Sequence, residues 1–254
     1  MKRTLATALL FAVAMAGLFS LLREWFHTDT FFPEASALSG FLTVFGSLYS
    51  ILTAFVILEV WKQYNNIAEL IDQEAQGLEQ LYGLTVYFRD DKLTAQTKEA
   101  IKEYASLIIE GQFRKLGGRD RTTRSSKAFE RIAEILSHVH FNDDHDSVVF
   151  NQVLEHYRQM ARTRTERINK SVRRLPVLLK SFIYVASFFT LLTFSFMPFS
   201  TSHYGALAML VISFQQIMIF FIIEGLDNPF VGHWRLTPEP FERLLHHLDE
   251  VEVG

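Results

Sequence analysis

The sequence contains no cysteine, which excludes disulfide bonds and thiolate chemistry. It also has no basic excess: 25 Lys and Arg stand against 28 Asp and Glu, so the net charge of −3 argues against a nucleic-acid partner. The nine histidines form no His-Glu-x-x-His pair, and Gly117-Gly118 lacks the Lys-Ser/Thr of a phosphate-binding loop. We therefore predict no metal site, no cofactor and no enzymatic activity.

The charged residues that are present are distributed unevenly. Twenty of the 25 Lys and Arg fall between Glu59 and Lys180, which leaves both ends of the chain apolar. Hydrophobic residues make up 49% of the chain, and Phe alone accounts for 24 positions. This segregation is what two solvents produce, with lipid around the ends and water around the middle.

Three long windows contain no Asp, Glu, Lys or Arg: residues 4–22, 35–58 and 181–223. A bilayer core of about 30 Å requires roughly 20 apolar residues in a helix. The third window is long enough for two spans, and Met197-Pro198-Phe199-Ser200-Thr201-Ser202 is typical of a tight turn between them. The sequence therefore predicts four membrane spans.

The first window has a second interpretation. Lys2 and Arg3, an apolar run, and then Ala14-Met15-Ala16 resemble a secretory signal peptide with its cleavage site. The apolar run continues through residue 22, however, which favours an uncleaved span. Both interpretations place the start of the second span outside the cell.

Basic residues near the span ends predict the orientation. Lys2 and Arg3 precede the first span, and seven basic residues between Arg158 and Arg174 precede the third. The loop between the first two spans offers Arg23 alone, and the turn between the last two offers none. Because basic loops stay in the cytoplasm, we expect both termini and the middle domain to be cytoplasmic.

The middle of the chain shows helical spacing, with helices expected near residues 59–88, 92–114, 126–139 and 147–174. Asp146 is a candidate N-cap for the last of these helices. The oxygen-rich loop at residues 142–146 does not match a calcium-binding EF-hand, and a solvated loop and cap is the favoured interpretation.

The most informative pattern is a row of residues spaced alternately three and four positions apart, which places them along one side of a helix. We call this row the seam. After the second span it contains Trp61, Tyr64, Ala68, Ile71, Ala75, Leu78 and Tyr82, and we expect this stripe to be buried within the subunit or between subunits. Within the span the same register gives Ser36, Gly40, Thr43, Ser47, Ser50, Ala54 and Ile57. No Pro or Gly occurs between Gly46 and Gly77, so one helix of about 50 residues is predicted.

The small and hydroxylated residues of this seam have two interpretations. Small residues let membrane helices pack closely, and hydroxyls with narrow side chains also suit the wall of a pore. The pore interpretation assigns the wall to Ser36, Gly40, Thr43, Ser47 and Ser50.

Two short motifs lie beside the second and fourth spans: Glu59-Val60-Trp61-Lys62-Gln63-Tyr64 follows the second, and Asp227-Asn228-Pro229-Phe230-Val231-Gly232 follows the fourth. With the layout of two spans, cytoplasmic helices and two further spans, these motifs resemble the prokaryotic and plant branch of the bestrophin-like membrane proteins. The resemblance implies a homo-oligomeric channel whose second span lines a central pore, with five subunits favoured over four. Bestrophins carry an acidic run after the second motif that helps to hold calcium. Here His233-Trp234-Arg235 stands in its place, so calcium gating is not expected.

Several polar residues lie in or beside the spans. Gln215 and Gln216 occur in the middle of the fourth span, where interhelical hydrogen bonds are expected to satisfy them. Candidate pore-mouth residues are the carboxylates at the span ends: Glu34, Glu59, Glu224 and Asp227.

The sequence thus predicts an all-α, four-span integral membrane protein of the plasma membrane, the inner membrane in bacteria. Spans one and two occupy residues 1–58, a cytoplasmic helical domain 59–174, spans three and four 175–225, and a cytoplasmic C-terminal segment 226–254. The predicted function is an oligomeric channel that conducts small monovalent ions through a central pore lined by the second span, and the sequence does not decide between anions and cations. The alternative is a non-conducting scaffold or sensor whose cytoplasmic helices bind a partner.

Overall fold

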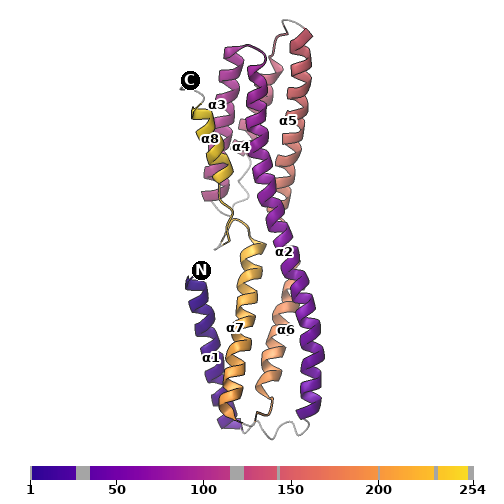
Figure 1. Cartoon of the computed structure of the whole chain (residues 1–254), viewed down its shortest axis with the longest axis vertical. Coiled ribbons are helices and arrows are strands. Elements are labelled where there is room, and N and C mark those ends of the chain that lie inside the picture. Colours follow the sequence, from indigo (N-terminus) through magenta and orange to yellow (C-terminus); the bar gives the residue numbers. More distant parts are fainter. Residues whose placement is uncertain are drawn as a thin grey trace. The chain divides into compact units, whose positions relative to one another are not determined.

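The computed structural model describes residues 2–26, 35–114, 123–141, 144–199, 201–231 and 234–250. Every regular element in these ranges is a helix (Figure 1). In chain order the helices are α1 (Lys2–Phe26), α2 (Ala35–Val86), α3 (Asp91–Ile108), the π-helix η2 (Ile109–Arg114), α4 (Thr123–Ser137), α5 (Asp144–Ser171), α6 (Val177–Ser195), α7 (Ser202–Asp227) and α8 (Glu239–Glu250).

The chain forms two compact units. Unit 1 comprises Met1–Lys62 and Arg174–Asn228, and unit 2 comprises Gln63–Arg173 and Pro229–Gly254. Helix α2 has 52 residues and contributes to both units. The prediction of one uninterrupted helix of about this length is therefore confirmed.

Four helices of the described part of the chain are long and apolar enough to cross a membrane: Arg3–Trp25, Ser36–Val86, Val177–Ser195 and Ser202–Asp227. Unit 1 contains three of them and the first part of the fourth, α2. Large apolar side chains remain exposed on their outer surfaces; Trp25 is 84% exposed and Leu178 is 85% exposed. Apolar surface of this extent on a water-soluble monomer would be unusual, whereas it suits a lipid environment. Helix α6 ends at Ser195 and α7 begins at Ser202, so the break between them lies within two residues of the turn predicted at 197–202.

Helix α1 lies along α7 (Figure 1). Its buried face contains Ala8, Ala12 and Phe19 at steps of four and seven, which is one helical stripe. The Phe19 ring packs against Gly205 of α7, where a larger residue would clash: a Cβ added at Gly205 would lie 2.7 Å from the ring. At the end of α1, Arg23 donates a 2.5 Å hydrogen bond to the carbonyl of Phe199.

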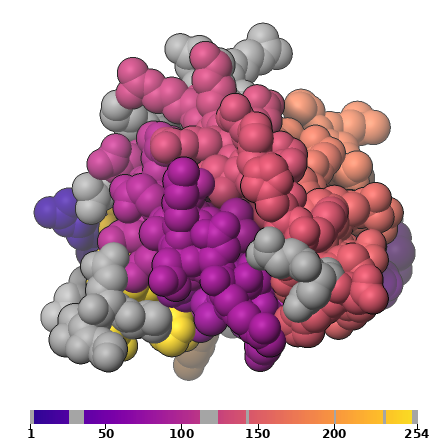
Figure 2. Space-filling model, turned by 90° about the horizontal axis from the view of Figure 1, so that it is seen from above, coloured from indigo at the N-terminus to yellow at the C-terminus, as the bar shows by residue number. Residues whose placement is uncertain are grey.

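Unit 2 has one core, to which α2 contributes Ile71, Ala75, Leu78 and Tyr82. These are four of the seven seam positions expected to be buried; Tyr64 and Ala68 are partly buried, and Trp61, which belongs to unit 1, is 44% exposed. Figure 2 shows the end of α2 (purple) beside α5 (pink), and Gly77 faces Met160 at this contact. The C-terminal helix α8 joins the core through its apolar side chains Phe241, Leu244 and Leu248.

The helices expected in unit 2 are present, with ends that differ from the predicted ones by up to three residues. The helix expected near 126–139 spans Thr123–Ser137, and the one expected near 92–114 is α-helical to Ile108 and continues as a π-helix to Arg114. Helix α5 begins at Asp144, so Asp146 is not its N-cap but lies in its first turn. An acidic side chain is favoured there as well as at the cap, because the helix N-terminus carries a partial positive charge.

Candidate functional site

The predicted pore face of α2 is exposed in the single subunit. Its five residues lie on one side of the helix, as their steps of three and four require, and each is exposed: Ser36, Gly40, Thr43, Ser47 and Ser50. A Cβ added at Gly40 would meet no atom within 4 Å. The structure therefore brings these five predicted residues together on a surface that no other part of the described subunit covers.

Three of the four hydroxyls on this face donate to the helix that carries them. Thr43 donates to the carbonyl of Ser39 at 2.9 Å, Ser47 to that of Thr43 at 2.7 Å, and Ser50 to that of Gly46 at 2.7 Å. Each of these three hydroxyl hydrogens is thus engaged, and the hydroxyl oxygen keeps its lone pairs for the surroundings. The face combines small side chains with weakly negative oxygen atoms.

A different side of α2 holds the helix in unit 1. Tyr49, Thr53, Val56 and Val60 are buried and follow one another at steps of four and three. We call the side of α2 that carries Ser36, Gly40, Thr43, Ser47 and Ser50 the hydroxyl face. At about 100° per residue, the buried stripe lies roughly 130° around the helix from this hydroxyl face. The two faces therefore have separate roles, one in packing and one in contact with the surroundings.

Tyr49 joins three helices through hydrogen bonds. Its hydroxyl lies 2.7 Å from the Ser187 hydroxyl of α6 and 2.5 Å from the Gln216 side-chain oxygen of α7. Ser187 also lies 2.9 Å from the same Gln216 oxygen. The expected interhelical hydrogen bond of Gln216 is confirmed, whereas Gln215 is exposed on the surface of α7.

A second polar cluster lies where α6 begins and α7 ends. Lys180 contacts Glu224 at 2.8 Å and Asp227 at 3.1 Å, and the Tyr184 hydroxyl donates to Glu224. Asp227 is buried and also accepts a 2.6 Å hydrogen bond from the backbone of Leu175. Both oxygens of Asp227 are therefore used to join the start of α6 to the end of α7.

The other pore-mouth candidates have different surroundings. The Glu224 side chain is 52% exposed beside Lys180, and Glu59 is exposed on α2. Glu34 lies outside the described residues. The assignment of these four carboxylates to a pore mouth stays a prediction.

Three further residues of the motif after the fourth span, Asn228, Pro229 and Phe230, make contacts that stabilise the fold. Asn228 accepts a 3.2 Å hydrogen bond from Arg174 in unit 1. The Pro229 carbonyl accepts one of 2.7 Å from Leu236, and Phe230 is buried in the core of unit 2. Gly232 lies outside the described residues.

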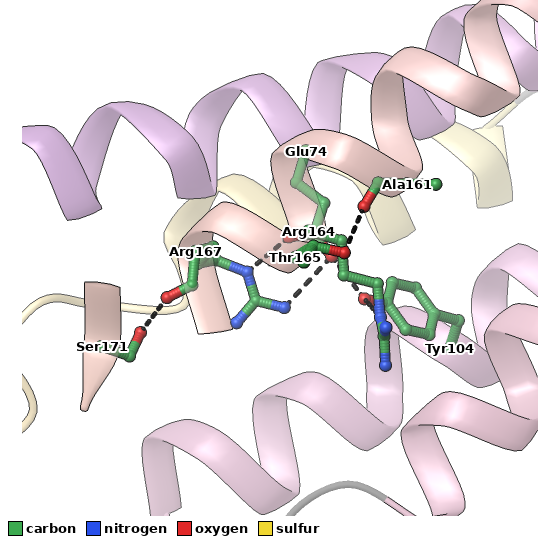
Figure 3. A network of polar contacts seen from close by, with 7 residues as sticks. All are labelled: Glu74, Tyr104, Ala161, Arg164, Thr165, Arg167 and Ser171. Carbon is green, nitrogen blue, oxygen red and sulfur yellow. Dashed lines mark hydrogen bonds and ion pairs between the residues drawn. The ribbon is translucent and has the colours of Figure 1, made fainter. Parts of the chain in front are cut away.

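Unit 2 contains a buried ion pair that was not expected from the sequence (Figure 3). Glu74 of α2 and Arg167 of α5 are 0% and 1% exposed. Glu74 accepts hydrogen bonds from Arg167 Nε, from Arg167 Nη2 at 3.1 Å and from the Tyr104 hydroxyl. Arg164 in turn donates to Tyr104 at 3.1 Å and to Ser126 at 2.9 Å. The network connects α2, α3, α4 and α5.

Burial changes the ionisation of this network. Burial and then the charge of Glu74 raise the pKa of Tyr104 above its ordinary value. For Arg167, burial alone would lower the pKa, but the charge of Glu74 outweighs it and the pKa is raised. Tyr104 therefore stays a hydrogen-bond donor and Arg167 stays a cation at physiological pH.

Within the described ranges, no group of three or more His, Asp or Glu side chains is placed to hold a metal ion.

Comparisons with known proteins agree with this architecture. A bacterial bestrophin homologue from Klebsiella pneumoniae, solved by Zn-SAD phasing, has a similar structure with a TM-score of 0.78 at 11% identity, covering 98% of each chain. A single-substitution variant of that homologue gives the same TM-score and identity, over 98% of this chain and 99% of the other. Another crystal structure, described only as a membrane protein, gives 0.77 at 10% identity. No curated protein sequence matches significantly. The model of the bestrophin-like domain matches residues 7–241, and the chain therefore belongs to the bestrophin-like family.

Proposed function

We propose that this protein is one subunit of an oligomeric ion channel in the plasma membrane, and that α2 lines its central pore. The single observation that carries the proposal is the exposure of the five hydroxyl-face residues of α2 within an apolar span. Family membership supports it, because bestrophin-like proteins are known as ion channels. The conducted species are small monovalent ions.

The chemistry of the hydroxyl face suits a water-filled path. An ion that enters a bilayer needs polar groups in place of part of its hydration shell, and hydroxyl oxygens with free lone pairs supply them. The hydroxyl hydrogens of Thr43, Ser47 and Ser50 already bond to backbone carbonyls. These hydrogen-bond donors therefore stay satisfied even where the pore is narrow and holds little water. Gly40 adds width, because no side chain projects there.

A pore of this kind requires several copies of the chain. One α2 helix exposes one hydroxyl face, so a ring of subunits is needed to surround a central path with such faces. We propose a ring of five, with four as the alternative. The same proposal places both termini and residues 59–174 on the cytoplasmic side, because basic residues cluster before the first and third spans.

The direct test is conduction by the purified protein in planar bilayers. A salt gradient across the bilayer gives the charge selectivity from the reversal potential. Ser47→Leu should lower the unit conductance, since an apolar constriction excludes water and ions. Leu48→Phe is the control, because Leu48 belongs to the neighbouring apolar face and is already 58% exposed. A monodisperse oligomer without any current would favour the non-conducting scaffold or sensor instead, and equal effects of the two variants would remove Ser47 from the pore.

A further inference from the structure

The contacts that hold α2 in unit 1 are mostly non-directional. Thr53, Val56 and Val60 are buried along the same stripe as Tyr49, but apolar packing depends on area more than on angle. Hydrogen bonds depend strongly on geometry, so the hydroxyl of Tyr49 supplies a directional contact within this stripe.

The number of hydrogens in the Tyr49 cluster distinguishes the roles of its members. Three short contacts connect Tyr49, Ser187 and the Gln216 oxygen, but the two hydroxyls provide only two hydrogens. Without the Ser187 hydroxyl, Tyr49 still donates to Gln216, and α2 stays attached to α7. Without the Tyr49 hydroxyl, Ser187 still donates to Gln216, so α6 and α7 remain joined and only α2 is detached from this cluster.

We propose that Tyr49 is a positioning residue that fixes the rotation of α2 and thereby directs the hydroxyl face toward the pore. This inference rests on the proposed channel function and adds a determinant of its geometry. Tyr49 lies on the side of α2 away from the hydroxyl face, so it acts on the path only through the orientation of the helix. Loss of one neutral hydrogen bond should shift the balance between the native and rotated orientations by about fivefold.

The experiment measures thiol accessibility, which is possible because the chain has no native cysteine. Ser47→Cys reports on the hydroxyl face and Leu52→Cys on the apolar face. Each reporter is placed in the full-length oligomer in lipid vesicles, with Tyr49 intact or changed by Tyr49→Phe, which keeps the ring and removes only the hydroxyl. Ser187→Ala is the matched control. The rate of reaction with a water-soluble maleimide is read from the gel shift, so that no current is required.

The expected result is a several-fold fall in the ratio of the Ser47→Cys rate to the Leu52→Cys rate on Tyr49→Phe, with little change on Ser187→Ala. An unchanged ratio on Tyr49→Phe would overturn the proposal, and so would an equal fall in both variants, which would indicate general loosening of the helices. If Leu52→Cys reacts faster than Ser47→Cys with Tyr49 intact, the proposed pore face is wrong. A shift caused by Tyr49→Phe alone would still support the positioning role.

Discussion

Arg167→Met would leave the Glu74 carboxylate buried without its counter-ion. Glu74 is 0% exposed, so water cannot replace the lost charge unless unit 2 opens. The change removes the two hydrogen bonds that Arg167 donates to the carboxylate and leaves the one from Tyr104. Breaking a buried ion pair on one side costs about 3–5 kcal/mol. For a unit of this size, that cost corresponds to a fall in Tm of roughly 10 °C.

The assay is thermal unfolding of the purified protein in detergent, followed by far-ultraviolet circular dichroism. The control is Arg131→Met, which breaks the 2.7 Å ion pair with Glu103; these side chains are 56% and 45% exposed. An exposed pair of this kind contributes about 0–1 kcal/mol. The double change Glu74→Leu with Arg167→Met removes both charges and should recover most of the stability. If Arg167→Met costs no more than Arg131→Met, or if the double variant is no better than the single one, the reasoning is refuted.

Three further predictions concern packing, pH and topology. Gly205→Val should lower the stability of unit 1 by about 1–3 kcal/mol through overpacking against Phe19, and adding Phe19→Ala should restore part of the loss in a thermal melt. Because the folded pKa of Tyr104 is raised, its contribution to stability is complete below about pH 10 and is lost as pH rises through the folded pKa. Alkaline unfolding should therefore be less steep in Tyr104→Phe and unchanged in the exposed control Tyr87→Phe. A cysteine introduced at Gly118 should react with an impermeant reagent only after cells are opened, and labelling from outside intact cells would contradict the proposed topology.

Local patterns in the sequence were sufficient for the spans and for the long helix, and they placed the pore-wall candidates on one side of α2. Apolar windows and three-four spacing depend only on neighbouring residues, so both signals can be read from the sequence alone. The position of Asp146 was harder, because the start of a helix shifts by one or two residues with little change in energy. The sequence therefore located α5 but not its first residue.

The two polar clusters depend on pairs far apart in the chain, which spacing cannot predict. Tyr49 and Ser187 are 138 residues apart, and Glu74 and Arg167 are 93 apart. A signal was nevertheless present for each cluster. Tyr49 places a hydroxyl in an apolar span where this chain otherwise uses Phe, and a buried tyrosine hydroxyl usually needs a partner. Glu74 occupies a position next to Ala75 on the apolar stripe of α2, where a carboxylate requires a buried cation.

The exposed surface of α2 has two kinds of chemistry, and this difference bears on assembly. On one side lie large apolar groups such as Phe41 and Phe55, which are 52% and 65% exposed. On another lie hydroxyls whose hydrogens are already bonded. Lipid solvates the apolar surface well, but its hydrocarbon chains offer no hydrogen-bond donor to the oxygen lone pairs of the hydroxyl surface. A single subunit in a bilayer would offer both surfaces to lipid, whereas a ring of subunits encloses the hydroxyl surface and leaves apolar side chains for lipid and for neighbouring subunits. The amphipathic character of α2 within its span is therefore itself an argument for a closed oligomer with a hydrated axis.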